Sequence, residues 1–179
     1  MECKKVVTLQ EIINRPKGHK IKTKMKDLEK LLKRKNINDS IIAIDEFVSE
    51  LCEYGENLEN LTEPQKNFFF NQQLEMEVNN GGFSQYFFNS PGDYAHQTVE
   101  SLKLIGANNV AKILQEAIDK FPNKTVPQDR TERQDVLLDE IEEKNEDVWN
   151  ELDDKFYEYP DDLSQLNFDY IKQNKEFFA

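Results

Sequence analysis

The sequence contains no long apolar run. The longest uninterrupted runs, residues 41–44 and 68–70, fall far short of the roughly 18 residues that a bilayer-spanning helix needs. The amino terminus has neither the apolar stretch nor the small-residue cleavage site of a secretory signal. Cysteine is scarce as well, and Cys3 and Cys52 are too few to build a disulfide scaffold. These absences exclude an integral membrane protein and lead us to expect a cytoplasmic one.

Motifs that carry catalytic chemistry are also missing. No glycine-rich phosphate loop, nucleophile elbow or paired-cysteine zinc motif occurs. Asp93, His96 and Glu100 stand at i, i+3 and i+7 and could hold a divalent metal, but a capping Asp beside a surface His/Glu pair explains them more simply. Cys52 lies among apolar helix positions, which is typical of a core residue rather than a nucleophile. We therefore predict no catalytic residue, no cofactor and no bound metal, and a protein that is not an enzyme.

Aromatic and charged residues are what the sequence does contain. Only 37% of its 179 residues are apolar, yet 12 Phe, 6 Tyr and 1 Trp supply aromatic rings that disordered chains generally lack. Charged residues make up 32% of the chain. Because a chain of this length has room for one modest core, we expect a single folded domain with a very polar exterior.

Helical patterns with a cap or a stop at their ends dominate the sequence. Thr62 and Gln65 form a capping box, and the Asn-Asn-Gly-Gly sequence at 79–82 must interrupt the helix that follows. We predict an all-α, single-domain multi-helix bundle, with a basic amino-terminal extension at residues 1–38 and an acidic helical domain at residues 39–179. The other expected helices begin at Asp39 or Ser40 and end at Gly55, begin at residues 90–93 and end at Gly106, run through Val110 and Ile118 to Pro122, and cover about residues 131–159 and about residues 163–178.

Charge is divided unevenly along the chain. Residues 1–35 hold 12 Lys or Arg and 4 Asp or Glu, a net charge of +8, whereas residues 36–179 hold 11 and 31, a net charge of −20. The acids are densest between positions 129 and 162, where 15 carboxylates accompany 4 basic residues. Such asymmetry favours a partner selected by charge. The alternative is a solvated acidic surface with a basic arm.

The basic amino-terminal region carries two local patterns. Thr8 and Glu11 form a capping box for a short helix, and residues 20–26 alternate Lys with other side chains, as a strand or a mobile arm would. These lysines could contact nucleic acid, but the net charge of −20 on residues 36–179 disfavours direct nucleic-acid binding. A solvated arm that partly neutralises its own domain is the simpler interpretation.

Residues 131–159 sort their carboxylates onto one side of a helical wheel. Apolar side chains such as Leu137 and Trp149 fall on an arc of roughly 140° to 260°, and the acids fall on the opposite half. A straight helix of this length would extend about 40 Å, comparable with one turn of duplex DNA at roughly 34 Å. A rigid row of carboxylates can imitate phosphates, although solubility alone is the alternative. The predicted partner-binding acids are Glu132, Asp135, Asp139, Glu142, Glu143, Glu146, Asp147, Asp153 and Asp154.

The loop of residues 79–93 is a second candidate site. Amide and carboxylate groups beside an aromatic cluster can orient a polar small molecule. The alternative is structural, because the glycines would supply positive φ while Asn80 and Asp93 would satisfy helix ends. The residues that would line such a ligand pocket are Asn79, Asn80, Gln85, Tyr86, Asn89 and Asp93.

The same loop carries a resemblance to a known family. From position 77 the chain reads EVNNGGFSQYFFNSPGDYA. Together with Glu100, Leu102 and residues 105–107, 121–122 and 152–157, this motif resembles a bacterial family typified by a DNA-mimic protein, over about residues 40–179. The resemblance implies an all-helical cytoplasmic protein whose acidic surface occupies the DNA-binding face of a transcription factor. It assigns no individual mimic residue.

The sorted carboxylates and the family resemblance lead to one hypothesis, a non-enzymatic acidic protein that binds a basic, DNA-binding protein. Two other interpretations remain open. An inhibitor or immunity-type protein directed against a nuclease would have the same charge pattern, and a ligand-binding or enzymatic domain would use residues 79–93. A homodimer also remains open, because the sequence does not set the oligomeric state.

Overall fold

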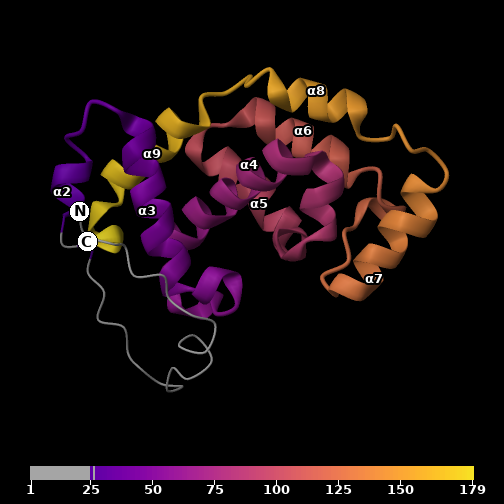
Figure 1. Cartoon of the computed structure of the whole chain (residues 1–179), viewed down its shortest axis with the longest axis horizontal. Coiled ribbons are helices and arrows are strands. Elements are labelled where there is room, and N and C mark those ends of the chain that lie inside the picture. The colour runs from indigo at the N-terminus through magenta and orange to yellow at the C-terminus, as the bar shows by residue number, and fades with distance from the viewer. Residues whose placement is uncertain (1–24, 26) are drawn as a thin grey trace, which may run out of the picture.

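The structure is a computed structural model that describes residue 25 and residues 27–179. The short helix expected at Thr8 lies outside these residues, as does nearly all of the alternating segment 20–26. No strand occurs in the described part of the chain, and most of it is helical, so the all-α prediction is confirmed. Figure 1 shows an elongated, arched arrangement of helices.

Helix α4 (Glu63–Phe88) connects the two halves of the molecule. It begins at the predicted capping box, where the Thr62 N–H donates a hydrogen bond to Gln65 Oε1 at 2.9 Å. Its first half buries Phe68 in one hydrophobic cluster, whereas its second half buries Phe83 in another. Both clusters are therefore built around this one helix.

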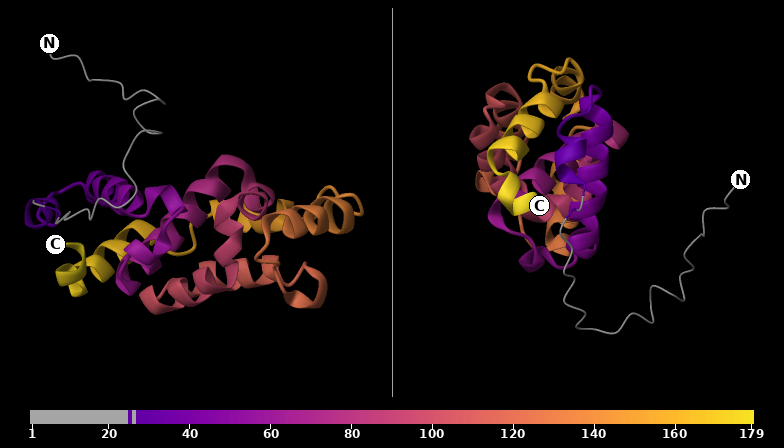
Figure 2. Two further views of the ribbon diagram at one scale, coloured as in Figure 1. Left: turned by 90° about the horizontal axis from the view of Figure 1, so that it is seen from below. Right: turned by 90° about the vertical axis from the view of Figure 1, so that its left-hand side faces the viewer.

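Helices from both ends of the described chain form the first half, and α9 lies beside α3 in Figures 1 and 2. Asn36, rather than Asp39 or Ser40, caps α3, because its Oδ1 accepts a hydrogen bond from the Asn38 N–H at 3.1 Å. This helix ends before Gly55, and the helix expected at 163–178 is divided at Asn174. The elements of this half are α2 (Leu28–Leu31), α3 (Ile37–Leu51), η1 (Glu53–Gly55), η2 (Leu58–Asn60), α9 (Leu163–Gln173) and α10 (Lys175–Phe178).

Helix α2 packs onto this half although it falls within the predicted basic extension. Leu28 and Leu31 are both buried in the same hydrophobic cluster as Phe68. The Lys175 ammonium also lies 3.3 Å from the Glu29 carboxylate, so α2 and α10 contact each other. Leu28 and Leu31 thus belong to the packed core.

The second half surrounds the remainder of α4 with aromatic side chains. The rings of Phe121 and Trp149 lie 4.8 and 5.4 Å from the Phe87 ring. Gly106 ends α5 in the left-handed conformation at φ 88°, as its position predicted. The elements of this half are η3 (Ser90–Tyr94), α5 (Ala95–Ile105), α6 (Asn108–Ile118), η4 (Pro122–Lys124), α7 (Arg130–Asp135), η5 (Val136–Glu142) and α8 (Asn150–Tyr157).

A glycine pair interrupts α4, as predicted. Gly82 has φ 69° and ψ −172°, a conformation that essentially only glycine adopts, whereas Gly81 is extended at φ −167°. The Phe83 N–H beyond the break donates to Asp153 Oδ1 at 2.8 Å. Asp153 therefore caps the second segment of α4 from α8 and joins the two helices.

A Gly82→Ala variant should lose about 2–3 kcal/mol of its free energy of unfolding. Its backbone would be strained at positive φ, and the new Cβ would collide with the Asp153 carboxylate. Gly81→Ala is the matched control, because its backbone is extended and its Cβ would meet only the flexible Gln85 side chain. Urea denaturation followed by circular dichroism measures both losses. Equal losses would contradict the special role of Gly82.

The prediction of one straight helix over residues 131–159 is wrong. Helix α7 leads into a π-helix, η5, and residues 143–149 form turns before α8 begins. Polar side chains hold these turns, since Asn145 Oδ1 accepts from the Asp147 N–H at 3.2 Å and Asp147 Oδ1 accepts from Asn150 Nδ2 at 2.7 Å. A continuous rod of about 40 Å is therefore absent. Most of the predicted apolar side is nevertheless buried. Leu138 and Tyr159 are exposed, and the buried residues of that side are Leu137, Ile141, Trp149, Leu152 and Phe156.

Candidate protein-binding surface

Carboxylates gather at the end of the molecule that is formed by α7, η5 and the turns after them (Figure 1, orange). Each one is exposed, and none forms an ion pair with a described residue. Of the basic residues between positions 132 and 147, Arg133 is buried and only Lys144 faces solvent. The group is called the carboxylate surface below, and its members are Glu132, Asp135, Asp139, Glu140, Glu143, Glu146 and Asp147.

Arg133 anchors the carboxylate surface to the rest of the fold. Its Nε donates to the Phe87 carbonyl at 2.6 Å, and its Nη2 donates to the Asn89 carbonyl at 3.0 Å and to Asp93 Oδ1 at 2.5 Å. These partners lie on α4 and η3, so α7 is attached to the centre of the molecule. Because the buried guanidinium is paired with the Asp93 carboxylate, its charge is offset by that carboxylate rather than by the exposed ones.

Three of the predicted partner-binding acids lie outside the carboxylate surface. Glu142 Oε1 accepts a hydrogen bond from Trp149 Nε1 at 2.7 Å, and Asp153 caps the second segment of α4. Burial raises the pKa of Asp153 above its ordinary value, while the hydrogen bond from the Phe83 N–H opposes that shift. Asp154 is exposed on α8. Glu142 and Asp153 therefore stabilise the fold.

Further acids between positions 129 and 162 cap helices. Asp129 caps α7 by accepting from the Glu132 N–H, and Asp162 caps α9 by accepting from the Gln165 N–H, each at 2.9 Å. Asp161 accepts from the N–H groups of Asn109 at 2.8 Å and Val110 at 2.9 Å. It thus caps α6, whose own N-cap position is an alanine. With Asp153, four of the 15 carboxylates in this stretch therefore accept hydrogen bonds from backbone N–H groups.

A second acidic stretch was missed by the sequence analysis. Residues 36–65 contain 8 Asp or Glu and no Lys or Arg. A single net charge for residues 36–179 conceals this stretch, whereas net charges counted over segments of about 30 residues reveal it. Its exposed acids lie on α3, η1, η2 and the residues beside them, and they are Asp39, Glu46, Glu50, Glu53, Glu56, Glu59 and Glu63.

Two partly buried carboxylates lie between α3 and α4. Burial raises the pKa of Asp45 from its ordinary value to about 6, and its Oδ1 has no hydrogen-bond partner among the described residues. Burial also raises the pKa of Glu75, with smaller contributions from the negative charges of Asp162 and Asp45. Both carboxylates are therefore costly for the folded state when they are ionised.

An Asp45→Asn variant should be more stable than the wild type at pH 7–8, by on the order of 1–2 kcal/mol. The folded-state pKa of about 6 exceeds the ordinary value of 3.8, so ionisation destabilises the wild type as the pH rises through about 6. Below pH 4 the carboxyl is protonated in both states and the advantage should disappear. Thermal denaturation from pH 4 to pH 8 tests this, with exposed Glu46→Gln as control. An advantage that is independent of pH would contradict the assignment.

The polar residues predicted to line a pocket at positions 79–93 bond mainly to their neighbours. Five of these six residues form a side-chain hydrogen bond, whereas Asn80 is exposed. Asp93 also lines a cleft. The contacts are Asn79 to Tyr159 at 2.8 Å, Gln85 and Asn89 to Glu77 at 2.7 and 2.8 Å, Tyr86 to Thr98 at 3.1 Å, and Asp93 to Arg133 at 2.5 Å.

The helical spacing of Asp93, His96 and Glu100 does not assemble metal ligands. His96 Nε2 accepts from the Val126 N–H at 3.2 Å, and Glu100 pairs with Lys103 at 2.8 Å. No cluster of three or more His, Cys, Asp or Glu side chains suited to a metal occurs within residues 25 and 27–179. His96 and Asp93 instead bond to segments outside α5, while Glu100 pairs within that helix.

The fold and its exposed carboxylates define an acidic, all-helical protein. None of its described helices is both long and apolar enough to span a membrane. The model of the DMP19-like protein family matches residues 59–174, and the chain belongs to that family. The matched region includes the whole carboxylate surface but begins after α3. No curated protein and no solved structure matches the chain.

Proposed function

We propose that this protein is a non-enzymatic DNA mimic, acting in the cytoplasm, whose carboxylate surface occupies the DNA-binding face of a transcriptional regulator. The observation that carries the proposal is the group of seven exposed carboxylates on α7, η5 and the following turns, which have no ion-pair partner among the described residues. Membership of the DMP19-like family supports it.

The chemistry of DNA recognition explains why such a surface could replace DNA. Duplex DNA carries one negative charge per roughly 1.7 Å of its axis, and proteins bind it largely through Lys and Arg. Closely spaced carboxylates present the same sign of charge and accept the same hydrogen bonds. The surface is also preorganised, because Arg133, Leu137 and Ile141 beneath it are buried.

Solubility alone is a weaker explanation for this arrangement. Neighbouring carboxylates on one helical segment repel one another and lower its stability. A mixed-charge surface would be equally soluble without that cost. Acids on α5, α6, α8 and α9 do pair with bases, as Glu151 does with Lys155 at 2.8 Å. The exposed acids of α3, η1 and η2 have no described ion-pair partner, and neither have those of the carboxylate surface. Unpaired acids grouped in this way favour a cationic partner.

Affinity capture tests the proposal. The full chain is immobilised and exposed to a bacterial lysate at low and high salt, and retained proteins are challenged with duplex DNA or with an uncharged polymer. We expect a DNA-binding regulator to be retained at low salt and to be displaced by DNA but not by the uncharged polymer. Salt screens the attraction between the two proteins, and DNA competes for the same Lys and Arg side chains of the regulator. Retention of no basic protein would contradict the proposal, and retention of a nuclease instead would favour an inhibitor of that class.

A further inference from the structure

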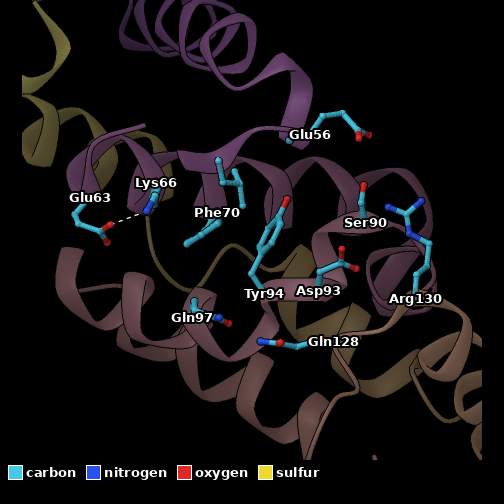
Figure 3. Close-up of a pocket in the computed structure, with 12 residues that line it drawn as sticks. Glu56, Glu63, Lys66, Phe70, Ser90, Asp93, Tyr94, Gln97, Gln128 and Arg130 are labelled. Atoms are coloured by element: carbon cyan, nitrogen blue, oxygen red, sulfur yellow. Dashed lines mark hydrogen bonds and ion pairs between the residues drawn. The ribbon is translucent and has the colours of Figure 1, made fainter. Parts of the chain in front are cut away.

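A polar cleft of about 630 Å³ lies between the two acidic regions (Figure 3). The 3₁₀ helices η1 and η2 form one wall, and the first turns of α4 with η3 and α5 form the other. Arg130, at the start of α7, lies at one end, and Lys66 lies at the other. The volume falls within the range of roughly 300–1,000 Å³ that ligand pockets occupy.

The side chain of Tyr94 marks the centre of this cleft. Tyr94 is 7% exposed, and its ring stacks on Phe70 with 4.5 Å between the ring centres. In Figure 3 the ring stands between Phe70 and Asp93. The hydroxyl forms no hydrogen bond with a described residue, whereas the buried Tyr86 hydroxyl bonds to Thr98. The hydroxyl oxygen is not among the enclosed polar atoms that lack a partner. It is therefore open to the cleft, where a ligand can reach it.

Acids and one unpaired cation line the cleft, because Arg130 is exposed and has no described ion-pair partner, but it lies at the end beyond Ser90 and Asp93 from Tyr94 (Figure 3). Lys66 is paired with Glu63 at 2.7 Å, and the buried Arg133 binds only one oxygen of Asp93, whose side chain stays 40% exposed. Glu56, on the opposite wall, is exposed, and its side chain has no described ion-pair or hydrogen-bond partner. The wall that carries Glu56 belongs to the stretch 36–65, which has no basic residue. At Tyr94, away from the end that Arg130 lines, a cation is therefore the charge that the cleft favours.

Burial determines the state of the Tyr94 hydroxyl. Burial raises the pKa of Tyr94 far above its ordinary value, and nearby acidic groups, including Asp93, raise it further. The hydroxyl therefore keeps its proton at every physiological pH. It can accept a hydrogen bond from a cationic donor while donating its own proton to a carboxylate.

We propose that this cleft receives an arginine side chain of the partner protein, with Tyr94, Glu56 and Asp93 contacting its guanidinium. This inference rests on the proposed function, because it names the group through which the partner is anchored. A guanidinium offers five donors in a planar fork, enough to reach a hydroxyl and two carboxylates together, and an ammonium offers three from a single point. The apolar stem of arginine can lie against Leu58 and Phe70, which also line the cleft.

The test uses the full chain and N-acetyl-arginine amide, with the lysine and citrulline derivatives for comparison. Citrulline has nearly the same shape as arginine but no charge. Titration is followed through the ring resonances of Tyr94 and Phe70. We expect arginine to bind most tightly and citrulline most weakly, because the cleft selects a forked cation. Citrulline binding as tightly as arginine, or no binding of arginine, would overturn the inference.

Two variants assign the binding to this cleft. Tyr94→Phe removes only the unpaired hydroxyl and should weaken arginine binding by about threefold to tenfold without changing the thermal midpoint. Glu56→Gln should have a similar effect, whereas Glu140→Gln, an equal change of charge on the carboxylate surface, should have none. Unchanged affinity in both cleft variants would overturn the inference.

The two proposals can fail separately. Capture of a regulator that DNA displaces, without binding of the arginine derivative, would contradict the arginine cleft and leave the proposed function intact. A chain that binds the derivative through Tyr94 and Glu56 but captures no DNA-binding protein would keep the cleft and lose the proposed mimicry.

Discussion

An Arg133→Met variant should lose about 3–5 kcal/mol of its free energy of unfolding. The fully buried guanidinium donates hydrogen bonds to the Asp93 carboxylate and to four backbone carbonyls, those of Phe87, Asn89, Pro127 and Gln128. Methionine can fill part of the space but donates no hydrogen bond, so these acceptors lose their partner. Since domains are typically stable by only about 5–15 kcal/mol, urea denaturation should show a large shift of the midpoint.

Two further substitutions separate anchoring from charge. Arg130→Met removes an exposed arginine from the same helix and should change stability by less than about 0.5 kcal/mol. Arg133→Lys retains the charge but cannot reproduce the fork of donors, so it should recover only part of the loss. If Arg133→Met unfolds at the wild-type urea concentration, the carboxylate surface is not anchored through this residue.

Features that depend on adjacent residues were predictable from the sequence. The capping box of Thr62 and Gln65 acts within one helical turn, and Gly106 ends α5 because glycine tolerates the left-handed conformation. The interruption at Gly82 follows from the same conformational freedom. An all-α fold could therefore be predicted without any knowledge of tertiary contacts.

Contacts between distant segments were not predictable in the same way. Arg133 entered the sequence analysis only as one of the 4 basic residues between positions 129 and 162. Charged side chains are rarely buried without a partner, and its partners Phe87 and Asp93 lie on α4 and η3. Asp161 caps α6 across a long sequence separation, and nothing near Asn109 reveals this. A helical wheel cannot identify an acid that caps a helix far away in the sequence.

The candidate surface was predicted in part. The wheel correctly placed Leu137 and Ile141 in the core and most of the acids in solvent, because both follow from helical periodicity. It failed on the straight rod, since the hydrogen bonds of Asn145 and Asp147 favour turns over a continuing helix. The acids kept their exposure although the helix was interrupted.

Reversal of Asp139, Glu143 and Glu146 to Lys should weaken binding of the captured regulator by about 100-fold or more, because like charges across an interface cost several kcal/mol. These three acids are exposed and have no described ion-pair partner. Glu142 is left intact because it accepts a hydrogen bond from Trp149. Titration calorimetry of the triple variant with the regulator gives the change in affinity. Trp149 is the single tryptophan of the sequence and is buried, so its fluorescence reports whether the fold beneath the carboxylate surface is preserved.

A matched reversal distinguishes a located surface from overall charge. Glu46 and Glu50 on α3 and Glu176 on α10 are exposed and have no described ion-pair partner, and their reversal changes the net charge by the same amount. We expect this control to weaken binding far less, because charges beyond roughly 10 Å are largely screened at 0.1 M salt. The salt dependence of binding should also fall more in the variant of Asp139, Glu143 and Glu146 than in the control, since that variant loses carboxylates that contact Lys and Arg of the regulator. Equal losses of affinity would mean that net charge, rather than the carboxylate surface, attracts the partner.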